Sequence, residues 1–223
     1  MAKPTLDLRC YFVTGQGPDI VERARAAALG GAGIIQVRSK PISARELYSL
    51  SLEVARAVHA VRPETHVLID DRVDVALALN DQGISGVHVG QDDLDVRMVR
   101  KLLGPSAVIG LTTGTMELVE AANELVREQP GVIDYIGCGP FRATPTKDSG
   151  REPIGLEGYP SLVAASKLPM VAIGDVTADD IYDLARAGVD GCAIVRGIMH
   201  AHDPQAYCEQ VVAEFDRGTA SRS

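Results

Sequence analysis

A short apolar run near residue 35 carries polar or basic side chains at every second position. Gln36, Arg38 and Lys40 are two residues apart, and alternate residues of a β-strand point to the same face. An arginine offers a planar fork of N–H donors and a lysine a compact charge, a pair suited to a diphosphate. We therefore expect these side chains to face a pocket. The alternative is a solvated pair beside the next loop.

Two aspartates follow later apolar runs. Asp70-Asp71-Arg72 ends the run 66–70, and Gly90-Gln91-Asp92-Asp93 follows the run 86–89. Mg²⁺ typically takes one or two carboxylates together with phosphate oxygens and water. If the two runs are neighbouring strands, Asp71 and Asp93 are candidate Mg²⁺ ligands. Each aspartate alone is equally well explained as a helix N-cap.

A third polar segment begins at Gly139. Residues 139–158 lack clear secondary structure, and a loop of that length in a compact domain is usually functional. Thr144, Thr146 and Lys147 offer two hydroxyls and an ammonium within it. We predict an active-site loop here. Ordinary solvated surface is the competing interpretation.

The elements that must position these residues alternate between short β-branched runs and longer helical periodicities, which is typical of a parallel sheet with crossover helices. Eight such units fit the length and predict one (β/α)₈ TIM barrel spanning residues 1–223. An open doubly wound sheet is disfavoured, because Gly15-Gln16-Gly17 lacks the spacing of its phosphate loop. The predicted strands are 9–14, 33–38, 66–70, 86–89, 107–111, 132–137, 169–174 and 190–195.

Capping signals mark several helices. Ser43 with Glu46 forms a capping box, and Thr115 precedes an apolar-periodic run. The last helix should begin near Pro204, and residues 218–223 are expected to form a frayed tail.

A barrel of this kind carries its chemistry at the carboxyl ends of its strands. The loops after strands seven and eight often bind a phosphate through backbone N–H groups. Gly174, Val195 and Arg196 occupy those places. This signal is shared by many barrels and does not identify the phosphate.

Composition narrows the partners. The chain has 223 residues and a formal net charge of −8, which argues against nucleic acid or an anionic membrane as a partner. It contains no apolar run of membrane-spanning length and no signal-peptide pattern at its start, so we expect a cytoplasmic protein. Its four cysteines are widely spaced and read as reduced, buried thiols.

Taken together, the motifs resemble the thiamine-phosphate synthase family along nearly the whole chain. The most specific are Gln-Val-Arg-Ser-Lys (36–40), Gly-Val-His-Val-Gly-Gln-Asp-Asp-Leu (86–94), Asp-Tyr-Ile-Gly-Cys-Gly-Pro (134–140) and Thr-Pro-Thr-Lys (144–147). The resemblance implies a homodimer and a dissociative, Mg²⁺-dependent reaction. In it, hydroxymethylpyrimidine diphosphate loses pyrophosphate and the nitrogen of thiazole phosphate attacks the exposed methylene carbon.

The resemblance also implies roles for individual residues. Arg38, Lys40 and Lys147 are the expected catalytic residues, and Asp71 and Asp93 the expected metal ligands. The expected substrate-binding residues are Gln36, Arg38, Lys40, Asp70, Thr112, Thr144, Thr146, Lys147, Gly174, Val195 and Arg196.

Three positions depart from the family pattern. Asp70 replaces a usual asparagine, Thr112 a common serine and Asp175 a usual glycine. These changes leave room for two alternatives, a thiazole tautomerase-like paralogue and a non-catalytic barrel that binds thiamine precursors. Retention of Asp71, Asp93 and the Thr-x-Thr-Lys segment favours the synthase.

Overall fold

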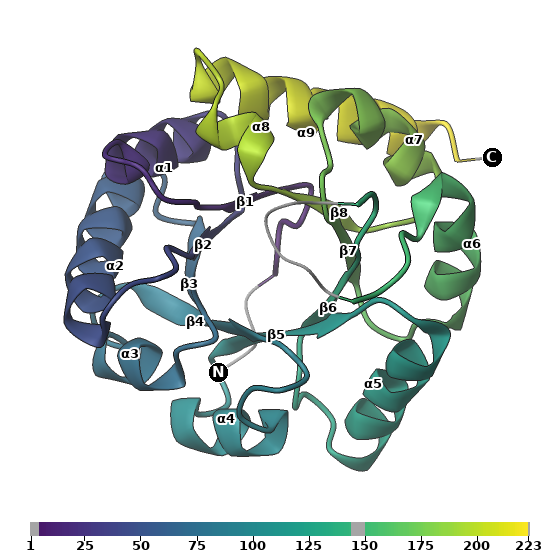
Figure 1. The fold of residues 1–223 in the computed structure, drawn as a ribbon, viewed down its shortest axis with the longest axis horizontal. Helices are drawn as coiled ribbons and strands as arrows, with labels where there is room; N and C mark the ends of the chain where they lie inside the picture. The colour runs from purple at the N-terminus through teal and green to yellow at the C-terminus, as the bar shows by residue number, and fades with distance from the viewer. Residues whose placement is uncertain (1–4, 144–149, 223) are drawn as a thin grey trace.

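Eight parallel strands close into a barrel within the computed structural model, which describes residues 5–143 and 150–222 (Figure 1). Each strand pairs with the next in chain order, and β8 pairs with β1. The strands are β1 (Cys10–Val13), β2 (Ile34–Val37), β3 (His66–Asp70), β4 (Ile84–Val89), β5 (Val108–Thr113), β6 (Tyr135–Cys138), β7 (Met170–Ile173) and β8 (Gly191–Ile194). The predicted (β/α)₈ fold is confirmed. β6 begins later than predicted, because the Val132 N–H donates to the Gln129 carbonyl in the turn after residue 128.

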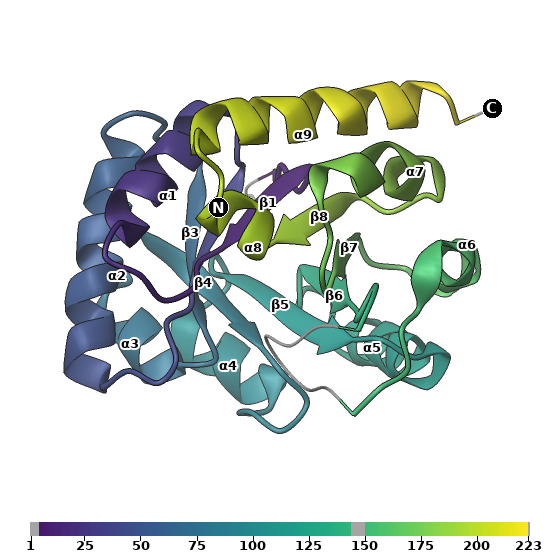
Figure 2. The same ribbon diagram turned by 45° about the horizontal axis from the view of Figure 1, so that its top comes forward.

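The helices form a ring around the strands (Figure 1). The described helices are α1 (Ile20–Leu29), α2 (Ala44–His59), α3 (Val73–Ala78), α4 (Val96–Leu103), α5 (Met116–Glu128), α6 (Gly155–Ala165), the 3₁₀ turn η1 (Ala178–Asp180), α7 (Ile181–Arg186), α8 (Arg196–Met199) and α9 (Pro204–Ala220). α9 packs against α7 and α1 (Figure 2), so the last helix covers the seam where β8 meets β1.

The predicted capping signals form as expected. The Ser43 side chain and Glu46 make a reciprocal capping box at the start of α2. The Thr115 hydroxyl accepts a hydrogen bond from the Leu118 N–H at the start of α5. These contacts satisfy N–H groups that the first turn of a helix leaves unpaired.

Alternation along the strands divides the core into two layers. Outward residues such as Phe12 pack against the helices, and inward residues such as Tyr11 and Val13 fill the barrel. Most strands supply apolar inward residues, but Gln36 on β2 and His88 on β4 place polar groups toward the cavity. The barrel interior is thus mostly apolar and becomes polar where Gln36 and His88 line the cavity.

Two boundaries differ from those predicted. α6 begins at Gly155, so the expected loop 139–158 ends four residues early, where the Gly155 N–H donates to the Phe141 carbonyl. α9 continues through Ala220, so the expected frayed tail at 218–223 is wrong for its first part. Gly218 packs closely on the Tyr182 carbonyl, and Arg222 donates to the Ala185 and Val189 carbonyls, which holds this end against α7.

Two further expectations concern the whole chain. All four cysteines are buried and unpaired, as predicted. Across residues 5–143 and 150–222, none of the helices has the length and apolar character needed to cross a membrane.

Candidate active site

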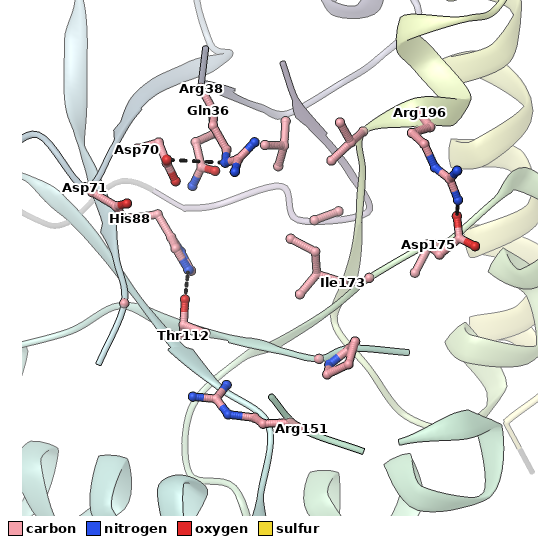
Figure 3. A pocket seen from close by; sticks show the side chains of 18 of the residues that line it. Gln36, Arg38, Asp70, Asp71, His88, Thr112, Arg151, Ile173, Asp175 and Arg196 are labelled. Carbon is pink, nitrogen blue, oxygen red and sulfur yellow. Dashed lines mark hydrogen bonds and ion pairs between the residues drawn. The ribbon is translucent and has the colours of Figure 1, made fainter. Parts of the chain in front are cut away.

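The carboxyl ends of the strands open on a cavity of about 680 Å³ (Figure 3). The lining includes these predicted site residues: Gln36, Arg38, Asp70, Asp71, Asp93, Thr112, Gly174, Val195 and Arg196. Lys40 lines a smaller adjoining cavity, which shares Arg38 and Asp70 with the first. Thr144, Thr146 and Lys147 lie outside the described residues. The structure therefore gathers the described site residues, which come from six of the eight strands or the loops after them, at one end of the barrel.

Ion pairs connect the ends of β2 and β3. The Lys40 ammonium lies 3.0 Å from the Asp70 carboxylate and also donates to Asp71, and Arg38 Nε lies 3.5 Å from Asp70. Burial, with the nearby Asp71 charge, raises the pKa of the Asp70 carboxyl despite Lys40 and Arg38. Burial also works against the Lys40 ammonium, but its contacts with Asp71 and Asp70 raise its pKa overall. Acidic and basic groups here are mutually compensated.

The two predicted metal ligands converge on the same side of the cavity. Asp71 adopts a left-handed φ of 57°, which aspartate tolerates better than most residues, and its N–H donates to the His88 carbonyl. Asp93 accepts a hydrogen bond of 2.7 Å from the Gly90 N–H. Burial raises the pKa of the Asp93 carboxyl, and the adjacent Asp71 carboxylate raises it further. The two carboxylates are thus close neighbours.

This pair fits a hard divalent cation. The two neighbouring carboxylates repel each other, and a cation bound between them would relieve that repulsion. The Lys40 ammonium, which donates to Asp71, already supplies one positive charge beside them. Within the described residues no group of three or more acidic, histidine or cysteine side chains is arranged to hold a metal. Two carboxylates are nevertheless sufficient for Mg²⁺ when phosphate oxygens and water complete its coordination.

Three residues that sequence reasoning left without a role connect Gln36 with Thr112. They are Tyr11, Tyr135 and His88. The Gln36 amide donates to Tyr11 Oη at 3.0 Å, and Tyr11 Oη lies 2.8 Å from Tyr135 Oη. His88 Nδ1 lies 3.0 Å from Tyr135 Oη, and His88 Nε2 lies 3.0 Å from Thr112 Oγ1. The one signal in the sequence that could have indicated a polar contact here is the histidine at an inward position of a buried strand.

Arg151 is a second residue that sequence reasoning missed. It lines the cavity near Thr112 (Figure 3). Its guanidinium donates to the Thr113 carbonyl at 2.9 Å. Its position just beyond the residues at 144–149 gave no signal in the sequence, because a single arginine in a polar loop is usually solvated. The contact holds Arg151 against the end of β5.

The rim at β7 and β8 has a different character. Gly174 has φ 104°, and a Cβ there would lie 2.6 Å from Pro140 Cα, so only glycine fits. Asp175 also adopts a left-handed conformation, with φ 59°, and forms an ion pair with Arg196 (Figure 3). Val195 precedes the first turn of α8. The Arg196 side chain is therefore engaged by a carboxylate at the predicted phosphate position.

Fold and site together define a (β/α)₈-barrel enzyme whose site lies at the carboxyl ends of its strands. The chain belongs to the thiamine monophosphate synthase family, whose model matches residues 10–198. It is thus a transferase of thiamine biosynthesis that acts on small molecules, as the sequence predicted.

Relatives of known sequence and structure agree with this assignment. The chain is 64% identical over 213 residues to a thiamine-phosphate synthase of Corynebacterium jeikeium, covering 95% of this chain and 96% of that one. It is 60% identical to the thiamine-phosphate synthase of Corynebacterium efficiens, covering 97% and 99%. The solved thiamine phosphate pyrophosphorylase of Pyrococcus furiosus superposes with a TM-score of 0.80 at 29% identity, covering 95% and 97%. These similarities favour the synthase over the two alternatives considered from sequence.

Proposed function

We propose that this chain condenses hydroxymethylpyrimidine diphosphate with thiazole phosphate to give thiamine phosphate and pyrophosphate. The bond between the pyrimidine methylene carbon and the diphosphate oxygen breaks with its electron pair on the oxygen. The thiazole nitrogen then donates its lone pair to the methylene carbon and forms the new C–N bond. The observation that carries this proposal is the meeting of Asp71, Asp93, Lys40 and Arg38 at one rim.

We propose Mg²⁺ as the cofactor, held by Asp71 and Asp93. When bound, it would supply positive charge to the diphosphate as that group departs. The neighbouring carboxylates and the hard oxygen donors support this assignment. No further metal ligand is needed from the protein.

The basic side chains that follow β2 would bind the diphosphate. Arg38 and Lys40 are ion-paired with Asp70 and Asp71, so binding exchanges carboxylate partners for phosphate oxygens. In this account Lys147, Thr144 and Thr146 complete the diphosphate and thiazole phosphate contacts, as the family resemblance implies. Gly174, Val195 and Arg196 would hold the thiazole phosphate.

The pyrimidine would lie over the floor formed by Gln36 and Thr112. Gln36 is 3% exposed and hydrogen-bonded, which gives it a fixed orientation. A positioned ring and an aimed nucleophile lower the entropy cost of the reaction, and buried walls keep water from an electron-deficient carbon. The protein's contribution is therefore positioning and electrostatics.

A substitution at Arg38 tests the grip on the diphosphate. We expect Arg38→Met to lower kcat/KM for pyrophosphate release by about a hundredfold or more, the scale of losing one charged donor at a developing anion. Arg97→Met is the matched control, because Arg97 is exposed on α4 and paired with Glu128. It should stay within a few-fold of the parent, and equal rates for the two variants would contradict the proposal.

We also propose a cytosolic homodimer, which the family resemblance implies. The net charge of −8 supports the absence of nucleic acid and anionic membranes among its partners. Sedimentation equilibrium of the purified chain would test the dimer, and a single species of monomer mass would contradict it.

A further inference from the structure

A continuous chain of hydrogen bonds joins two sides of the cavity floor through the barrel interior. It runs from the Gln36 amide to Tyr11, from Tyr11 to Tyr135, from Tyr135 to His88, and from His88 to the Thr112 hydroxyl. Each link measures 2.8 to 3.0 Å between heavy atoms. Its two ends, Gln36 and Thr112, both line the cavity (Figure 3).

The number of protons ties these two ends together. Four links require four protons, whereas the two tyrosines and a neutral imidazole carry one each. One end must therefore supply the fourth. Because the Gln36 amide N–H donates to Tyr11, Tyr11 donates to Tyr135, Tyr135 to His88 Nδ1, and His88 Nε2–H to Thr112. The Thr112 proton is then left for an acceptor outside the chain of hydrogen bonds, and the Gln36 carbonyl oxygen for a donor.

Burial supports the count of protons. Tyr11 is 2% exposed and Tyr135 fully buried, and burial raises the pKa of both phenols, so each keeps its proton. Reversing the hydrogen bonds would require the Gln36 amide to turn over, both hydroxyls to rotate and His88 to change tautomer together.

Two glycines make the space for the His88–Tyr135 contact. A Cβ at Gly110 would lie 2.2 Å from the Tyr135 ring and 2.4 Å from His88 Nδ1, and one at Gly137 would lie 2.9 Å from His88 Cε1. The neighbouring strands therefore carry no side chain at the positions that the network occupies. Phenylalanine would fill the same volume as Tyr135, so packing alone does not account for two facing hydroxyls.

We propose that Tyr11, Tyr135 and His88 are positioning residues that fix Gln36 as a hydrogen-bond acceptor and Thr112 as a donor. This pair matches a ring that offers an exocyclic amino group and an unprotonated ring nitrogen. It opposes a ring with an oxo group and a protonated nitrogen, because both polarities are then reversed. The inference rests on the proposed function, since it assigns the base of this selectivity within the same site.

Binding of two probes tests the proposal without turnover. The dissociation constants of hydroxymethylpyrimidine diphosphate and of its analogue with an oxo group in place of the amino group are measured by calorimetry, with Mg²⁺ and without thiazole phosphate. We expect the parent protein to prefer the amino form by about a hundredfold or more. Tyr135→Phe and Tyr11→Phe each interrupt the chain of hydrogen bonds and should reduce that preference about tenfold.

Tyr159→Phe is the matched control. Tyr159 is also fully buried, and its hydroxyl donates to the Cys138 carbonyl at 2.9 Å, outside the network. It loses the same group, so a preference unchanged in Tyr159→Phe separates the network from a general effect of a lost buried hydroxyl. If one network variant does not fold, the other decides.

The outcomes separate the two proposals. An amino preference that survives in Tyr135→Phe and Tyr11→Phe, or is absent from the parent protein, overturns the role of the network. Failure of the parent protein to release pyrophosphate from the two substrates overturns the proposed function instead, whatever the binding preference.

Discussion

Asp175 and Arg196 form an ion pair across the ends of β7 and β8. Asp175 holds a left-handed backbone conformation beside Gly174. Its carboxylate is paired with the Arg196 guanidinium at the position where a phosphate is expected to bind. A phosphate and a carboxylate compete for the same donors. We therefore infer that the pair competes with thiazole phosphate for Arg196.

Removing the Asp175 charge should strengthen phosphate binding. We expect Asp175→Asn to lower the KM for thiazole phosphate by up to about fivefold, because a partly exposed ion pair contributes at most about 1 kcal/mol. Asparagine also tolerates the left-handed conformation. Initial-rate kinetics with varied thiazole phosphate would measure this. Asp179→Asn, an exposed charge on the neighbouring turn, should change KM little, and a raised KM in Asp175→Asn would refute the competition.

Breaking a buried ion pair outside the site should lower the free energy of unfolding markedly. Arg100 Nη2 lies 2.7 Å from Asp134, and the two side chains are 9% and 10% exposed. Asp134 also accepts a hydrogen bond from the Ile109 N–H. Removing one partner leaves a buried charge uncompensated, so we expect Arg100→Met to lower the free energy of unfolding by about 3–5 kcal/mol in urea titration.

Arg127→Met is the control for that loss. Arg127 pairs with Glu124 on the exposed face of α5, and exposed pairs of this spacing contribute about 0.5 kcal/mol or less. Equal stability changes in Arg100→Met and Arg127→Met would show that burial of the first pair does not matter.

The space beneath the cavity gives a further prediction. Gly110→Ala would place a methyl group against Tyr135 and His88, and overpacking a filled interior typically costs about 1–3 kcal/mol. We expect that loss in the free energy of unfolding. In Gly15→Ala the new methyl would meet Met199 at an ordinary 3.6 Å, so its stability should be nearly unchanged. A fully stable Gly110→Ala would mean that the network has room to move.

The barrel was predictable because its signals are local. Alternation, caps and strand-end positions are written in neighbouring residues, so the strands and the gathering of Asp71, Asp93 and Arg38 at one rim follow from sequence. The network from Gln36 to Thr112 was not predictable, because Tyr11, Tyr135 and His88 lie on three strands and their contacts depend on barrel register. The persistence of α9 to Ala220 likewise depends on the tertiary contacts of Gly218 and Arg222.

The Mg²⁺ proposed at Asp71 and Asp93 is the centre of the account, and pyrophosphate release tests it most directly. We expect the purified chain with both substrates to release pyrophosphate when Mg²⁺ is present, to stop when a chelator is added, and to resume when Mg²⁺ is restored in excess. Asp93→Asn should lower the rate by about a hundredfold or more while its thermal unfolding stays cooperative. Release that continues undiminished in chelator would contradict the account.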